Sequence, residues 1–133
     1  MNFKDYLTNA RTGDPKVVAL NIKSNFNLME SVDDVTAMTD LIVDIFGEKL
    51  GEWEKGSELL KKLKNNATIP DKAHMNRAVA ILSLGNNPNL SMDKFGVEDQ
   101  IVIYTTTAAA ISKLGGVKNA EKLLSKVAEL KTK

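Results

Sequence analysis

The chain has 133 residues, the length of a single domain, and 43% of them are apolar and 26% charged, as in ordinary globular proteins. It contains no cysteine, which excludes disulfides, thiolate nucleophiles and cysteine-ligated metal sites. The formal net charge of +1 identifies no class of partner. We expect one all-helical domain over residues 1–133.

Two short helices are predicted at the start. The first has four apolar residues spaced as on one helical face, namely Phe3, Tyr6, Leu7 and Ala10. Gly13 should end it. Asp14 followed by Pro15 predicts the start of the second helix, because Asp is a good N-cap and proline lacks only an N–H that the first turn does not use. This second helix should end near Asn25.

The best-marked helix is predicted from Ser31 to about Leu50, because Ser31 and Asp34 match a capping box. Its polar side carries four acidic residues at spacings of seven, four and four: Asp33, Asp40, Asp44 and Glu48. They form a solvated face, a surface for a protein partner or a nucleic-acid mimic, or a metal site. The metal site is the least favoured, because the E-x-x-H motif of carboxylate metal helices is absent.

Trp53 is the only tryptophan, and glycines at positions 51 and 56 flank it. It is either a lid of the core over the preceding helix end or an exposed anchor for a partner, since tryptophan is enriched in binding hot spots. Ser57 is predicted to cap a short helix that follows. A basic cluster accompanies that helix: Lys55, Lys61, Lys62 and Lys64. It is either a solvated face or a surface for nucleic acid.

A further helix is predicted from Pro70 to about Leu84, with Thr68 as N-cap and Gly85 as C-cap. It carries His74, the only histidine. Imidazole catalysis would have to use this residue, but no G-x-S-x-G motif surrounds any serine. We therefore expect His74 to be structural. The turn-rich sequence GNNPNLS that follows predicts an exposed loop or hinge.

The segment IVIYTTTAAAISKLGG, residues 101–116, begins like a β-strand and ends like a helix. No second β-branched run or hairpin signal offers it a partner strand. We therefore predict a helix that is apolar on most sides and central in the bundle. The last predicted helix is amphipathic, with its apolar residues three and four apart: Ala120, Leu123, Leu124, Val127 and Leu130.

These elements predict an all-α fold, an irregular orthogonal bundle of five to seven helices with residues 97–114 as the central buried helix. The first residues have no apolar run of signal-peptide length, and no run approaches the roughly 18 apolar residues of a membrane span. We expect a soluble, cytoplasmic protein.

Charge is unevenly distributed along the chain. Residues 30–58 contain nine acidic residues against two lysines, whereas residues 59–78 have a balance of +4 and residues 118–133 one of +3. Only two of the 18 basic residues are arginine, the residue that reads guanine edges, which weakens a hypothesis of sequence-specific DNA binding. The excess of Lys and Asn is typical of AT-rich genomes, as in many phages.

These observations favour a non-catalytic protein-binding regulator, inhibitor or assembly factor of the kind that phages encode, without a cofactor or metal. It would act through the acidic helix face at residues 33–54 and through Trp53. A second hypothesis is a helical domain that binds nucleic acid through residues 55–64 and the C-terminal lysines. A third is a structural subunit that assembles with itself through residues 117–130.

Overall fold

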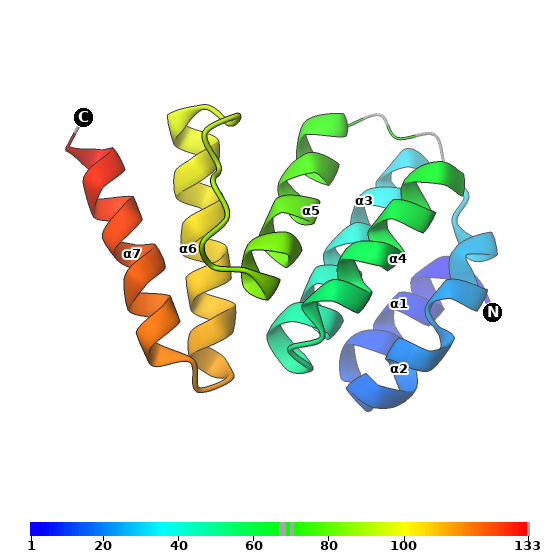
Figure 1. Ribbon diagram of the computed structural model, residues 1–133. Helices are drawn as coiled ribbons and strands as arrows, with labels where there is room; N and C mark the ends of the chain where they lie inside the picture. Colours follow the sequence, from blue (N-terminus) through cyan, green and yellow to red (C-terminus); the bar gives the residue numbers. More distant parts are fainter. Residues whose placement is uncertain (67–68, 70, 133) are drawn as a thin grey trace.

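A computed structural model describes residues 1–66, 69 and 71–132, and these residues form helices without a β-strand (Figure 1). The α-helices are α1 (Phe3–Thr12), α2 (Pro15–Asn21), α3 (Val32–Ile42), α4 (Trp53–Asn66), α5 (Lys72–Asn86), α6 (Val97–Lys113) and α7 (Val117–Lys131). A 3-10 segment, η1 (Lys23–Leu28), follows α2, and a π-helical segment, η2 (Val43–Lys49), continues α3. The all-α prediction is confirmed. The predicted count of five to seven helices is not confirmed, and the orthogonal arrangement stays a prediction.

The helices lie side by side in a row, with the two ends of the chain at opposite ends of that row (Figure 1). Helices α1 and α2 form one end and α7 forms the other. One hydrophobic core runs through the row, and its fully buried side chains include Ile22, Met38, Ile42, Leu60, Leu82, Ile103 and Leu123. No described helix has both the length and the apolar character that crossing a membrane requires.

Two predicted helix starts are confirmed in atomic detail. The side-chain oxygen of Ser31 accepts a hydrogen bond from the Asp34 backbone N–H at 3.2 Å, and the Asp34 carboxylate accepts one in return from the Ser31 N–H at 3.3 Å. The Asp14 carboxylate accepts from the Lys16 N–H at 2.9 Å, with Pro15 as the first helical residue. Local side-chain capping therefore sets where these helices begin.

Two other predicted helix ends are wrong. Ser57 is not a cap, because α4 begins at Trp53 and Ser57 is buried inside it. Gly85 is not a cap either, because α5 continues through it to Asn86. The predicted roles of Thr68 and Pro70 lie outside the described residues. Helix α5 instead begins at Lys72, where the Asp71 carboxylate accepts from the His74 backbone N–H at 2.9 Å.

The ambiguous segment is a helix, and α6 has the predicted bounds within one residue. Its position differs from the prediction, because α6 lies between α5 and α7, second from one end of the row (Figure 1). Two flanking helices cover only part of its surface, so Val102 is 48% exposed and both Thr105 and Thr106 face solvent. The buried Thr107 hydroxyl donates to the Ile103 carbonyl at 2.7 Å, which satisfies this polar group within the helix.

No sequence signal predicted the π-helical segment η2. It ends with the Leu50 N–H donating to the Ile45 carbonyl at 3.0 Å, five residues back, and with Gly51 at a φ of +64°. Glycine adopts this left-handed conformation without the steric cost that a side chain would carry. Short π-helical turns are rare and frequently lie at functional sites, and η2 carries Asp44 and Glu48.

Candidate functional site

A groove of about 390 Å³ lies where α3 and η2, α5 and α6 meet. Its lining combines aliphatic side chains with polar and charged ones: Val43, Ala78, Ile81 and Val102, and Asp40, Asp44, Glu48, His74, Arg77 and Thr106. Ala78 and Ile81 are buried, so the groove has an apolar floor, whereas the carboxylates of η2 are about one-third exposed and form part of its rim. This combination of floor and rim is typical of a recognition site.

His74 and Asp40 join two of the elements that form the groove. The ring nitrogen Nε2 of His74 lies 2.7 Å from Oδ1 of Asp40. The first turn of α5 positions the ring, because the Asp71 cap fixes the backbone of His74. On the next turn of α5, Arg77 Nη1 lies 3.4 Å from the Asp99 carboxylate of α6. The polar side of α5 thus connects to both α3 and α6.

The other two acidic residues of the groove face lysines at the rim. Lys49 Nζ lies 3.7 Å from the Asp44 carboxylate, and the Lys113 ammonium of α6 donates to the Glu48 carboxylate. The hydrogen bond to Glu48 and the charge of Glu48, with a further contribution from Asp44, raise the pKa of Lys113 above its usual value. Both lysines are side chains at the solvent boundary and not fixed parts of the groove floor.

Three of the four acidic residues predicted to share a face therefore meet in this groove: Asp40, Asp44 and Glu48. Asp33 does not belong to it and lies exposed in the first turn of α3. Sequence reasoning did not assign Arg77 to the site and described His74 only as structural. Their spacing of three residues places them on one face of α5, but only the packing of α5 beside α3 and α6 shows which surface they join.

Trp53 is not an exposed anchor, because only 9% of its surface is accessible. Its ring fits between two glycines, so that a Cβ placed on Gly47 would lie 2.8 Å from Cζ3 of the indole, and one placed on Gly85 would lie closer still to the ring. The structure agrees with the core-lid interpretation. It also explains why α5 carries a glycine at position 85, in its last turn, because the absence of a side chain there leaves room for the indole.

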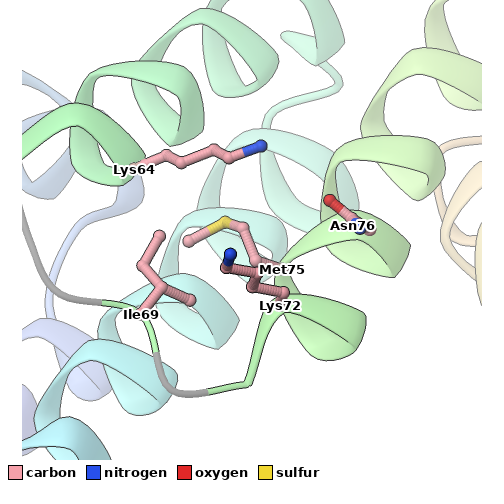
Figure 2. Close-up of a pocket in the computed structure, with 5 residues that line it drawn as sticks. All are labelled: Lys64, Ile69, Lys72, Met75 and Asn76. Atoms are coloured by element: carbon pink, nitrogen blue, oxygen red, sulfur yellow. The ribbon is translucent and has the colours of Figure 1, made fainter.

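The basic cluster lies on the outer face of α4, where Lys61, Lys62 and Lys64 are exposed. Lys55 forms a loose surface pair with Glu52 at 3.8 Å. Lys64 extends from α4 toward α5 across a pocket of about 240 Å³ that Lys72 and Met75 also line (Figure 2). Trp53 at the start of the same helix is buried, so it offers these lysines no exposed aromatic ring.

The terminal helix α7 uses its apolar stripe inside the molecule. Ala120, Leu123 and Val127 are buried in the core beside α6. Only Leu124 and Val117 remain as large aliphatic side chains that are about half exposed on its outer side. Self-assembly through residues 117–130 stays a prediction, and its interface would consist mostly of polar side chains.

Within the described ranges, no three His, Asp or Glu side chains are placed so that they could hold a metal ion together. Comparison of the chain with family models, with curated proteins and with solved structures gave no match. The groove, the basic face of α4 and α7 are therefore interpreted from their own geometry.

Proposed function

We propose that this protein is a non-catalytic binding protein, a regulator, inhibitor or assembly factor, which holds a segment of a protein partner in the groove between α3–η2, α5 and α6. The observation that carries the proposal is the convergence of Asp40, Asp44 and Glu48 above an aliphatic floor. The fitting partner segment combines basic side chains with aliphatic ones. The absence of cysteine supports a cytoplasmic setting, where structural disulfides are rare.

The rim lysines do not close the groove to such a segment. Exposed pairs such as Lys49–Asp44 contribute only about 0–1 kcal/mol, and their long side chains can move aside. A lysine or arginine of the partner would then replace Lys49 or Lys113 at the carboxylates of η2. The Asp40 carboxylate is 59% exposed, so it remains accessible beside His74.

The size of the groove favours one helical face. Its volume of about 390 Å³ lies toward the lower end of the roughly 300–1,000 Å³ of ligand pockets. An amphipathic helix in a groove places a few aliphatic anchors three and four residues apart. Val102, which is 48% exposed at the edge of this groove, would be covered by such a helix.

The proposal is tested with a synthetic peptide of roughly 16 residues, long enough to form a helix, with leucines along one face and lysines beside them. Isothermal titration compares the native protein with the double variant Asp44→Asn, Glu48→Gln. The matched control is Asp33→Asn, Glu58→Gln, which removes the same charge from exposed positions outside the groove. A peptide with glutamate in place of lysine controls for the charge of the ligand.

We expect the groove variant to bind the lysine peptide roughly tenfold more weakly, the sum of two partly exposed charge pairs. The control variant should bind it within twofold of the native protein. Equal weakening in both double variants would show only general attraction between opposite charges and would contradict a specific groove.

A second candidate function is nucleic-acid binding through α4, because Lys61, Lys62 and Lys64 are exposed and form no ion pair with any described acidic residue. Fluorescence anisotropy with a labelled duplex and with a single strand at low salt tests it. The logarithm of the binding constant should fall linearly with the logarithm of the salt concentration. In the double variant Lys61→Gln, Lys64→Gln, this slope should be smaller in magnitude than in the control double variant Lys4→Gln, Lys16→Gln. Unchanged anisotropy at low salt would exclude this candidate.

A further inference from the structure

The turn-rich segment 87–96 packs against α6 and α7 and encloses two adjoining pockets. One has a volume of about 300 Å³ and the other about 200 Å³. They share three residues: Asp93 of the segment, Tyr104 of α6 and Lys126 of α7. The segment is held on both sides, because Gln100 donates to the Phe95 carbonyl at 2.8 Å and the Lys122 ammonium donates to the Asn89 side-chain oxygen. The loop predicted from the sequence thus forms a wall of a polar pocket.

Tyr104 lines both pockets. Only 6% of its surface is accessible, and no hydrogen bond joins its hydroxyl to another described residue. The hydroxyl is nevertheless not sealed in the core, because Tyr6 is the one described residue with a fully buried and unpartnered side-chain polar atom. Buried tyrosines usually satisfy their hydroxyl. Because Tyr104 lines both pockets, its unpartnered hydroxyl is available there as a donor.

Two lysines add positive charge beside this hydroxyl. Lys122 and Lys126 lie four residues apart on α7 and both line the larger pocket, where Asp93 is the one acidic residue among the lining. Lys126 forms no ion pair with any acidic residue that the structure describes. Lysine is a common point-charge ligand of phosphate groups. Pro88 and Leu90 give the same pocket an apolar side.

We propose that this pocket binds the anionic group, a phosphate or a carboxylate, of a small organic molecule. The Tyr104 hydroxyl donates a hydrogen bond to the anion, Lys126 and Lys122 supply charge, and the apolar part of the ligand contacts Pro88 and Leu90. The volume of about 300 Å³ suits a small molecule and not a macromolecular segment. This site is separate from the groove of α3–η2 and does not depend on the function proposed for that groove.

The test is an amide chemical-shift titration of the ¹⁵N-labelled protein with phenyl phosphate, benzoate and, as the neutral control, phenol. We expect both anions, or one of them, to shift amides of segment 87–96 and of α7 near Lys126 at roughly 10 mM, ten times a millimolar Kd. The comparison of phosphate with carboxylate identifies the preferred anion. Phenol should produce no comparable shifts.

Two variants and one control test the assigned roles. Tyr104→Phe and Lys126→Gln should each weaken binding of the preferred anion about tenfold, as for hydrogen bonds to charged groups. Lys118→Gln, an exposed lysine on the same helix outside both pockets, should leave the Kd within twofold. Any one of three results would overturn the proposal. The spectrum of the native protein could stay unchanged with both anions, phenol could reproduce the shifts, or Lys118→Gln could weaken binding as much as the two pocket variants.

Discussion

The ring nitrogen Nε2 of His74 lies 2.7 Å from the carboxylate oxygen Oδ1 of Asp40, and this contact joins α5 to α3 along the candidate groove. The two residues are 34 positions apart in the chain. The groove exists because α5 packs beside α3 and η2, so contacts that fix this packing also fix the spacing of the groove walls.

The first prediction concerns the contribution of this pair to stability. A double-mutant cycle with His74→Gln, Asp40→Asn and the double variant should give a coupling free energy of about 0.5–1.5 kcal/mol, as for a partly exposed charged hydrogen bond. Urea denaturation at neutral pH supplies the free energies of unfolding. Additive single effects would show that the contact does not hold α5 to α3.

His74 also allows a direct check on the non-catalytic proposal. His74→Ala should keep binding of the lysine peptide within about fivefold, because a lost partly exposed contact changes affinity by no more than about 1 kcal/mol. The measurement is the same isothermal titration, with Asp44→Asn, Glu48→Gln as the impaired reference. An activity found for the native protein and lost only in His74→Ala would contradict the proposal.

The second prediction is that Tyr6→Phe stabilises the protein. The Tyr6 hydroxyl is buried without a hydrogen-bond partner, and an unsatisfied buried polar group costs about 1–3 kcal/mol. The free energy of unfolding should rise by roughly 1 kcal/mol, measured by urea denaturation. Tyr104→Phe is the matched control, and with its accessible hydroxyl it should change stability by less than about 0.5 kcal/mol. An equal gain in the free energy of unfolding of both variants would contradict the assignment of Tyr6 as the residue with the unsatisfied buried hydroxyl.

Tyr6 further predicts a dependence of stability on alkaline pH. Burial raises the pKa of Tyr6 above its ordinary value of 10.0, so the unfolded chain loses this proton before the folded one does. Ionisation of Tyr6 leaves the free energy of unfolding unchanged below about pH 10. Above that pH, the free energy of unfolding falls as the pH rises toward the raised pKa. Tyr6→Phe should therefore lose less stability than the native protein between neutral pH and that range. Parallel pH profiles would contradict the prediction.

The third prediction concerns the place of Trp53 against Gly85. At an ordinary helical position, replacing glycine by alanine stabilises by about 1 kcal/mol. At Gly85 the added methyl group would meet the indole of Trp53, so Gly85→Ala should destabilise by about 1–3 kcal/mol through overpacking. Gly96→Ala, at the N-cap of α6, is the control for a glycine with free space around it, because a Cβ there meets nothing within 4 Å, and it should change stability by less than about 1 kcal/mol. The fluorescence emission maximum of this single tryptophan should be blue-shifted from that of free tryptophan. A maximum near that of free tryptophan would contradict its burial.

Local sequence signals predicted the helix starts that depend on local hydrogen bonds. The Ser31–Asp34 capping box and the Asp14 cap are formed by residues within three positions of each other. Gly85 and Ser57 were assigned to helix ends because glycine and serine are common there. Their actual surroundings come from Trp53 and the core, which lie in other parts of the fold.

The candidate site was predictable only in part for the same reason. The acidic spacing correctly placed Asp40, Asp44 and Glu48 on one side of a helix. It did not predict the π-helical turn of η2, or that His74 and Arg77 from α5 would face these carboxylates. Such relationships depend on which helices become neighbours, and amphipathic periodicity within a single helix carries no information about that.

The most direct test of the groove is an amide chemical-shift map of the ¹⁵N-labelled protein with the leucine–lysine peptide. The proposal predicts that the largest shifts fall on three elements together, near Asp44, Ala78 and Val102, and that Asp44→Asn, Glu48→Gln removes them. Shifts spread equally over exposed acidic residues such as Asp33 and Glu58, or no shifts at all, would contradict the central claim that this groove is a binding site.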